Sequence, residues 1–320
     1  MNAELHVVFG SGPVGLAVVD ELARRHHRVR LVNRSGRANV PAGVEVAAGN
    51  AADPASTRDL CRGAAVVYNC LNAPDYHKWP EQFPPLQAGV LEGAASGGAR
   101  LVVMENLYMY GPHGGKPMTE DMTMNATRGT RGPTRARMTQ DLFDAHRSGK
   151  VRVVSARASD FFGPRVHESS AGDRMFVPLL AGKTVQMMGD PDVPHSYTYM
   201  PDIGRALVML GECDEAFGQA WHIPSAETVT PRRFVTMIAE EAGVEPKIAA
   251  LKKSPLRAVM LPLMGLFVPP LRGYDEVLYQ FDEPFIVDAA KFERLFGRIA
   301  TPLRDAIRET VAWHRQNGAR

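Results

Sequence analysis

The sequence predicts an α/β fold: a doubly wound parallel sheet followed by a smaller C-terminal lobe. Apolar runs of strand length alternate with amphipathic stretches through the first half of the 320 residues. A glycine-rich turn lies between the first apolar run and the first amphipathic stretch. Because parallel strands need crossover helices, this alternation favours a sheet with helices on both faces.

Six apolar runs have the length and composition of buried strands: Leu5–Phe9, Val29–Val32, Val44–Ala47, Ala65–Cys70, Leu101–Met104 and Val151–Ser155. Apolar residues at helical spacing predict helices at about Pro13–His26, Phe83–Gly97 and Thr134–Arg147. Pro13 fits the first turn of its helix, because the N–H that proline lacks would have no intrahelical partner there.

The second half has a different pattern of predicted elements: after Phe162-Gly163-Pro164 they are short and separated by prolines and glycines. We therefore expect a nucleotide-binding domain over residues 1–164, to which later segments can return, and a smaller mixed α/β substrate lobe over 165–320. The apolar stretch Ala258–Leu271 is interrupted by prolines and is shorter than the ~20 residues of a spanning helix, which predicts a buried helix and loop. Further helices are predicted at Thr230–Ala242, Tyr274–Tyr279, Asp288–Phe296 and Thr301–His314.

Composition excludes several classes of function. Lys and Arg total 37 against 35 Asp and Glu, an excess too small to indicate a nucleic-acid partner or an anionic membrane. The three cysteines lack metal-ligand spacing and the N-terminus lacks the pattern of a signal peptide, which favours the cytoplasm. No Gly-x-Ser-x-Gly, His-Glu-x-x-His or Cys-x-x-Cys motif is present, so neither a hydrolase nor a metal site is predicted. The expected partner is a small-molecule substrate.

The glycine turn reads Gly10-Ser11-Gly12-Pro13-Val14-Gly15 and stands directly between a predicted strand and a predicted helix. Glycine permits the tight turn, lets the backbone approach a pyrophosphate and allows close packing of helix on strand. The helix N-terminus adds N–H donors and positive potential. This context predicts a dinucleotide site of the Rossmann type; the alternative is a turn that binds nothing.

The end of the second strand predicts which dinucleotide binds. NAD(H) sites usually place Asp or Glu there, about 20 residues after the glycines, to bind the ribose hydroxyls. This chain has Asn33-Arg34-Ser35, with Arg37 close behind. A guanidinium binds a 2′-phosphate that a carboxylate would repel, so the expected cofactor is NADP(H). In the alternative interpretation, Arg34 is only a solvated loop residue.

Further motifs follow the glycine turn: Gly49-Asn50-Ala51-Ala52-Asp53, Tyr110-Gly111, Phe161-Phe162-Gly163-Pro164 and Tyr199-Met200-Pro201-Asp202. Together with the turn they resemble the extended short-chain dehydrogenase/reductase family, which includes sugar-nucleotide epimerases and dehydratases. The resemblance implies that Asn50, next to Ala51 in the cofactor site, meets the adenine. It also implies that Cys70-Leu71-Asn72 follows the cofactor toward the nicotinamide, and that the chain forms a homodimer through the helices at 83–97 and 134–147.

The catalytic residues of that family are replaced in this chain. Its members typically use a Tyr-x-x-x-Lys pair and a Ser or Thr at the end of the fifth strand. By position these become Arg131, Arg135 and Asn106. Arg135 can serve as a cation and ribose donor and Asn106 can hold a carbonyl oxygen, whereas Arg131 stays protonated and cannot replace the tyrosine. Proton delivery needs another group.

Tyr108 is the candidate proton donor nearest in sequence to Asn106, supported by the cation of Arg135; alternatively it is a packed tyrosine. Glu105 is a weaker candidate, because alternation along the strand points it away from Asn106. The segment Asp75-Tyr76-His77-Lys78-Trp79 offers Tyr76 or His77 as an acid, or is a plain polar loop. His195 is interpreted either as a proton carrier or as a structural histidine.

We interpret the chain as an NADP(H)-dependent oxidoreductase that acts on a small or medium organic substrate, with Asn106, Tyr108 and Arg135 at the reacting centre. Two alternatives stay open: a redox-neutral epimerase, isomerase, cyclase or lyase, and a non-catalytic protein that senses NADP(H). A partly apolar pocket is indicated by four residues, each of which also fits a core position: Met175, Phe176, Leu263 and Phe267.

Overall fold

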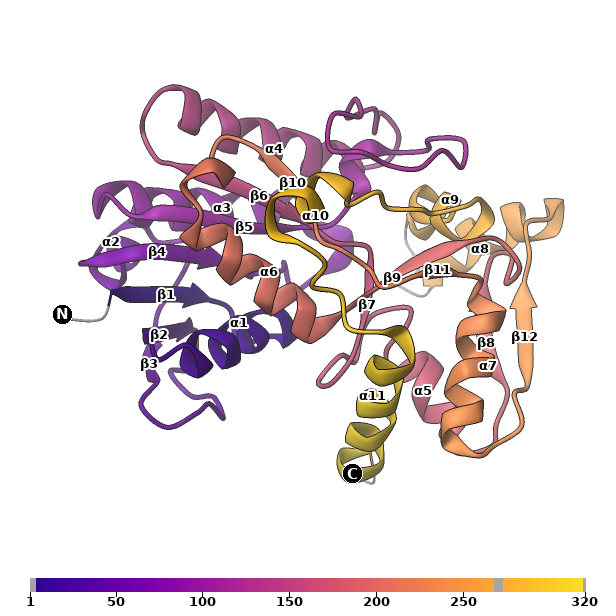
Figure 1. The fold of residues 1–320 in the computed structure, drawn as a ribbon. Coiled ribbons are helices and arrows are strands. Elements are labelled where there is room, and N and C mark those ends of the chain that lie inside the picture. Colours follow the sequence, from indigo (N-terminus) through magenta and orange to yellow (C-terminus); the bar gives the residue numbers. More distant parts are fainter. Residues whose placement is uncertain (1–3, 268–272, 319–320) are drawn as a thin grey trace. The chain divides into compact units, whose positions relative to one another are not determined.

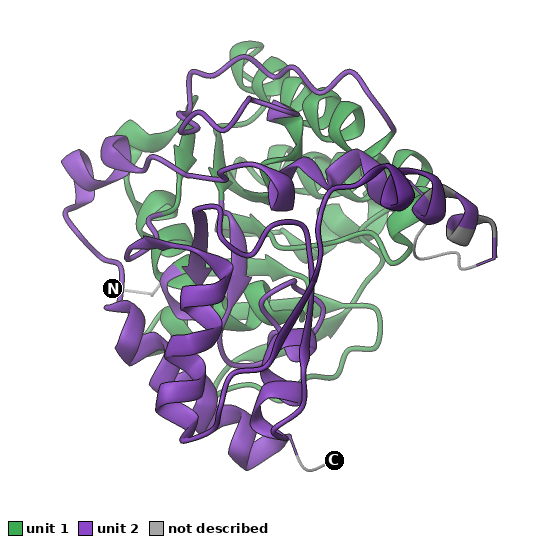
Figure 2. Cartoon of the chain, turned by 90° about the vertical axis from the view of Figure 1, so that its right-hand side faces the viewer, with its two compact units in different colours: residues 1–109, 130–157, 203–223 green, residues 110–129, 158–202, 224–320 purple. Residues whose placement is uncertain are grey.

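The structure is a computed structural model that describes residues 4–267 and 273–318. It divides into two compact units, coloured separately in Figure 2. Unit 1 comprises residues 1–109, 130–157 and 203–223, and unit 2 comprises residues 110–129, 158–202 and 224–320. Residues 110–129 and 158–164 belong to unit 2. Residues 203–223 return to unit 1 because they contain a strand of its sheet.

Unit 1 is built on a seven-stranded sheet in which every neighbouring pair is parallel, which confirms the predicted fold class. The strand order is β10-β6-β5-β4-β1-β2-β3. Each of the six predicted strands is present, with bounds that differ by at most a few residues. The seventh strand, β10, pairs with β6 and was not predicted. The bounds are β1 Leu5–Phe9, β2 Arg28–Asn33, β3 Glu45–Ala48, β4 Ala64–Asn69, β5 Arg100–Glu105, β6 Val153–Arg157 and β10 Ala220–His222.

The helices of unit 1 cover the two faces of this sheet (Figure 1). Helices α2 (Pro54–Leu60), α3 (Trp79–Ser96) and α4 (Arg131–Arg147) pack their apolar side chains on one face. Helices α1 (Pro13–Arg24) and α6 (Met200–Glu212) meet on the other, where a Cβ on Gly204 would come within 2.5 Å of the Ala17 carbonyl. The predicted helices at 83–97 and 134–147 both begin earlier than expected, at Trp79 and Arg131.

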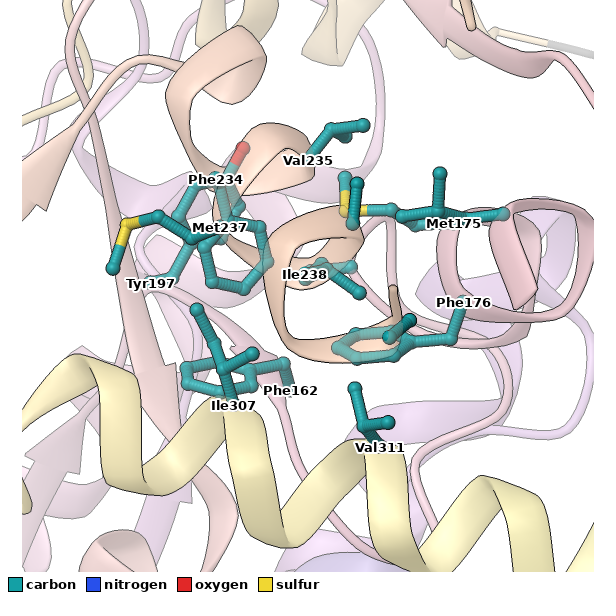
Figure 3. Close-up of a cluster of buried hydrophobic side chains, with 14 of the residues drawn as sticks. Phe162, Met175, Phe176, Tyr197, Phe234, Val235, Met237, Ile238, Ile307 and Val311 are labelled. Atoms are coloured by element: carbon teal, nitrogen blue, oxygen red, sulfur yellow. The ribbon is translucent and has the colours of Figure 1, made fainter. Parts of the chain in front are cut away.

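Unit 2 contains two small sheets, of order β11-β9-β7 and β12-β8, and a separate hydrophobic core. Figure 3 shows this core, where side chains of α5, α7 and α11 meet those of β7 and β9. The helix predicted at 230–242 is α7, and that at 301–314 is α11. The bounds are α5 Asp173–Leu180, α7 Pro231–Ala242, α11 Leu303–Asn317, β7 Asp160–Phe162, β8 Val185–Met188, β9 His195–Tyr199, β11 Thr228–Val229 and β12 Ile248–Leu251.

The remaining predicted helices of unit 2 are shorter than expected. The segment 274–279 is a 3₁₀ turn, Tyr274–Val277, followed by α9 (Tyr279–Asp282), and α10 covers Ala290–Phe296. Across residues 4–267 and 273–318, no helix has the length and apolarity that crossing a membrane requires.

The apolar stretch at 258–271 contradicts the prediction of a buried helix. Residues Pro255–Phe267 form helix α8, and residues 268–271 lie outside the described part of the chain. Leu263 and Phe267 are 54% and 84% exposed, so neither occupies a core. Met175 and Phe176, by contrast, lie in the core of unit 2. Burial in α8 includes Arg257 and Leu261, while Leu256 and Val259 are exposed, so hydropathy by itself did not predict which side chains are covered.

Candidate cofactor and active site

The glycine turn brings together the carboxyl ends of three strands of unit 1. Gly10 has a φ of +106°, which favours glycine, and its N–H bonds the Val32 carbonyl of β2 at 2.9 Å. A Cβ on Gly10 would lie 2.9 Å from the Cys70 carbonyl, after β4, and a Cβ on Gly15 would lie 1.8 Å from the Gly10 carbonyl. A Cβ on Gly12 meets nothing within 4 Å. The turn is therefore closed behind Gly10 and Gly15 and open in front of Gly12, at the N-terminus of α1.

Asn33 organises the loop that follows β2. Its Nδ2 donates to Ser11 Oγ of the glycine turn at 3.0 Å and to the Arg37 carbonyl at 2.8 Å. Its Oδ1 accepts from the Gly36 N–H at 2.7 Å and from Ser35 Oγ at 3.1 Å. The loop is thereby fixed against the glycine turn by Asn33, which the sequence analysis named only as a residue of the cofactor site.

Arg34 and Arg37 both stand on this loop with exposed side chains. Neither guanidinium forms an ion pair with any carboxylate of the described residues, although nearby Arg30 pairs with Glu45 at 2.9 Å. An exposed guanidinium without an acidic neighbour keeps its full positive potential. The end of β2 is therefore a cationic position beside the glycine turn.

The other predicted cofactor residues lie at the same edge of the sheet. Asn50 uses its Oδ1 to accept the Ala52 N–H at 3.1 Å, and the Gly49 N–H bonds the Asn33 carbonyl at 2.9 Å. Cys70 donates its N–H to the Phe9 carbonyl at 2.9 Å, and burial raises the pKa of its thiol. The loop after β3 is thereby tied to the end of β2, and the loop after β4 to the end of β1. The exposed positions of that edge include Asn50 and Asn72.

Arg135 belongs to a buried ion cluster centred on Glu105, the last residue of β5. Oε1 of Glu105 accepts from Arg135 Nη2 at 3.1 Å and from Thr139 Oγ1 at 2.8 Å. Its other oxygen accepts a short hydrogen bond from Ser155 and lies 3.5 Å from Arg157 Nε. All the side chains of this cluster are buried. Sequence reasoning did not identify these partners of Glu105.

Burial lowers the pKa of Arg135, and Arg157 acts in the same direction, while the Glu105 carboxylate opposes both. The guanidinium carbon also lies 4.8 Å from the centre of the Phe83 ring. Nε of Arg135 has no hydrogen-bond partner among the described atoms, although the residue is only 1% exposed. A buried donor without a partner costs about 1–3 kcal/mol, which a ligand acceptor would relieve.

The end of β5 also holds Asn106 and Tyr108. Oδ1 of Asn106 accepts the Tyr108 N–H at 3.2 Å, which closes a turn and leaves the side-chain amide group as a donor. The Tyr108 hydroxyl shares a short hydrogen bond with the hydroxyl of Tyr76. Arg131 lies over the other ring of this pair, its Cζ 4.4 Å from the centre of Tyr76. Arg131 is thus a cation in contact with one ring of this pair, that of Tyr76.

The candidate residues of unit 2 have structural partners. His195 is buried, with Nε2 3.2 Å from Asp160 Oδ2, and its ring stacks on Phe285. The same Asp160 oxygen accepts from Ser170 Oγ at 2.7 Å. Burial, with the Asp160 charge second, raises the pKa of Tyr197. This arrangement fixes the loops around β7 and β9.

Unit 1 thus combines a parallel sheet, a glycine turn at its carboxyl edge and a cationic loop beside that turn, which is the architecture of dinucleotide-binding α/β proteins. The family model for the NAD dependent epimerase/dehydratase family matches residues 7–223. Since this match covers more than half of the 320 residues, the chain belongs to that family. No curated protein matches the chain by sequence.

Solved structures with the same fold include the crystal structure of gox2253, at 20% identity and a TM-score of 0.82, covering 98% of this chain and 99% of that one. UDP-glucose 4-epimerase from Thermus thermophilus, in complex with NAD, has 17% identity and a TM-score of 0.75 over 98% and 99%. The dTDP-glucose 4,6-dehydratase from Bacillus anthracis, also with NAD, has 14% identity and a TM-score of 0.78 over 98% and 97%. At these identities the likeness shows the fold.

Proposed function

We propose that the chain is an NADP(H)-dependent oxidoreductase that acts on the carbonyl or alcohol group of a small or medium organic molecule. The observation that carries the proposal is the loop after β2, where Asn33 holds two exposed arginines beside the glycine turn. A carboxylate at this point would favour NAD(H), and the chain has none there. The family description and the NAD bound in related structures support a nicotinamide dinucleotide in general.

The size of the preference follows from the chemistry of Arg34. A hydrogen bond to a charged group contributes about 1.5–3 kcal/mol, so one guanidinium on a 2′-phosphate shifts the affinity ratio roughly ten- to a hundred-fold. Arg37 stands on the same loop and adds long-range attraction that salt weakens. The open side of Gly12 and the N-terminus of α1 suit the pyrophosphate.

We assign three residues to the reacting centre. When bound, the nicotinamide supplies or accepts the hydride. Asn106 holds the substrate oxygen with its side-chain amide, and Tyr108 delivers the proton. Arg135 offers its buried Nε to the nicotinamide ribose, while Glu105 holds the rest of its guanidinium in place.

Calorimetric titration with NADPH and NADH tests the proposal. We expect NADPH to bind at least ten-fold more tightly than NADH, and the preference to shrink in Arg34→Ala. Arg28→Ala is the matched control, because that exposed arginine stands at the opposite, amino end of β2. Asn106→Ala should bind NADPH normally and lose turnover of carbonyl substrates. Equal affinity for both nucleotides would refute the assignment of NADP(H).

A redox-neutral reaction is the second candidate, favoured by membership of the epimerase/dehydratase family. Product would then form with no net oxidation of NADPH, which absorbance of the reduced cofactor measures directly. We also propose a homodimer through α3 and α4, which light scattering would detect as twice the mass of the chain.

A further inference from the structure

Two tyrosines meet at the carboxyl edge of the sheet in unit 1. Tyr76 opens a 3₁₀ turn (Tyr76–Lys78) after β4, and Tyr108 opens another (Tyr108–Tyr110) after β5. Because β4 and β5 are neighbours in the sheet, the loops that follow them are adjacent. The two hydroxyls share a short hydrogen bond, and both side chains are half-buried.

Trp79 fixes the geometry of the pair. Its ring stacks on Tyr108 with centroids 5.8 Å apart and meets the edge of Tyr76 at 4.7 Å. The Trp79 side chain is buried and packs in turn on Phe83 of the same helix. Because Trp79 contacts both rings, the hydroxyls are held together by packing as well as by their hydrogen bond.

Arg131 supplies the charge. Its guanidinium carbon lies 4.4 Å from the centre of the Tyr76 ring, and its side chain is 1% exposed. A cation within about 4–6 Å favours the ionised form of an acid, and the effect is stronger where water is excluded. Arg131 stands at the position where the resemblance to the dehydrogenase family expects a tyrosine. The phenol absent at that position is available instead from Tyr76 and Tyr108, on two adjacent loops.

We propose that Tyr76 and Tyr108 act as one proton-donating unit whose ionised form is stabilised by Arg131. This inference rests on the proposed reduction of a carbonyl group. Tyr108 is the catalytic residue, because it would touch the substrate oxygen. Tyr76 and Arg131 are positioning residues that act through Tyr108, by hydrogen bond and by charge.

The proton and electrons balance as follows in the reducing direction. The carbonyl carbon receives the hydride while its oxygen receives the proton of the Tyr108 hydroxyl, so one phenolic O–H bond breaks and one alcohol O–H bond forms. The carbonyl is reduced and the cofactor is oxidised. The phenolate of Tyr108 then takes the proton of Tyr76 along their hydrogen bond, and Tyr76 regains a proton from water.

The first experiment titrates the phenols of the cofactor-free protein by ultraviolet difference absorbance. We expect one phenolate to form about one pH unit below the main group of tyrosines, and to disappear from that range in Tyr76→Phe and in Tyr108→Phe. Tyr274→Phe is the control, because that tyrosine lies in unit 2 and should leave the early step intact. A titration of wild type without an early step would overturn the proposal.

The second experiment follows the pH dependence of kcat. The donor must be protonated for reduction, so kcat should fall as pH rises through the early ionisation. Tyr76→Phe should lower kcat about ten-fold with KM nearly unchanged and move this fall to higher pH, because the phenolate of Tyr108 loses its hydrogen bond. The pH at which kcat falls should stay close to that of the wild type in Arg131→Lys, which keeps the positive charge, and should rise in Arg131→Met, which removes it.

The two proposals fail in different ways. Absence of NADPH binding would refute the proposed function, yet the phenol titration needs no cofactor and would still test the tyrosine pair. Normal NADPH turnover with an unchanged pH profile in Tyr76→Phe would overturn the pair and leave the oxidoreductase intact. Far-ultraviolet circular dichroism of every variant separates either result from misfolding.

Discussion

Glu105→Gln is expected to lower the free energy of unfolding of unit 1 by about 3–5 kcal/mol. The substitution keeps the shape of the side chain but removes the negative charge that neutralises Arg135 and Arg157. Both arginines are buried, and their nearest nitrogens lie 3.1 and 3.5 Å from the carboxylate. An amide accepts on one side only, so one guanidinium also faces a donor in place of an acceptor.

The magnitude follows from the location of this charge. Removal of one partner from a buried ion pair leaves an uncompensated charge in a medium of low dielectric constant, which costs about 3–5 kcal/mol. Glu92 provides the matched control, because it also contacts two cations, Arg58 at 3.2 Å and Lys150 at 3.0 Å, but stands on the surface of α3. Solvent screens that cluster, so Glu92→Gln should cost less than about 1 kcal/mol.

Tryptophan fluorescence during urea unfolding can report on unit 1 by itself. The three tryptophans of the chain are Trp79 and Trp221 in unit 1 and Trp313 in unit 2. A Trp313→Phe background confines the signal to unit 1, which matters because two units need not unfold together. If Glu105→Gln costs no more than Glu92→Gln, the buried cluster does not stabilise unit 1 as argued.

Three further predictions concern the cofactor site and the base of the sheet. Arg34→Ala should weaken NADPH roughly ten- to a hundred-fold and leave NADH within about two-fold in calorimetry; equal losses would contradict a 2′-phosphate contact. Gly15→Ala should abolish binding of both nucleotides, because its Cβ would stand 1.8 Å from the Gly10 carbonyl; retention of affinity by a folded variant would refute that role. Burial lowers the pKa of His6 to about 3, and the charges of His27 and Arg100 act in the same direction. As pH falls, His6 is therefore protonated in the unfolded chain before it is protonated in the folded protein. Unfolding free energy should therefore fall by about 1.4 kcal/mol per pH unit between about pH 6 and 3, a slope that chemical denaturation should find missing in His6→Gln.

Local patterns predicted the nucleotide-binding half of the fold well. A short window of sequence is enough to recognise the spacing of apolar residues, which is two in strands and near four in helices. The glycine turn is also contained in such a window. They placed β1 to β6 and the turn at Gly10–Gly15 close to their observed positions. Strand β10 was not predicted because it has only three residues and forms by pairing with β6, which is far away in sequence.

The contacts that define the candidate active site depend on long-range packing. Arg135 on α4 meets Glu105 thirty residues earlier at the end of β5, and Tyr76 meets Tyr108 because β4 and β5 are neighbours. The sequence analysis identified Tyr108 as a candidate proton donor and Tyr76 as a weaker candidate. It could not pair them, because spacing along the chain does not say which loops share an edge.

Two arginines stand where the resemblance to the dehydrogenase family expects a Tyr-x-x-x-Lys pair, and both have partners in the structure. Arg131 and Arg135 are four residues apart on α4, so both point to one face of the helix and each needs a partner there. Arg135 has the carboxylate of Glu105 and the ring of Phe83, and Arg131 has the ring of Tyr76. Restoring only a tyrosine at position 131 would therefore remove the cation over Tyr76 and leave Glu105 bound to Arg135. We therefore expect a change at either arginine to disturb its partner as well, since each charge on α4 is matched by a carboxylate or an aromatic ring.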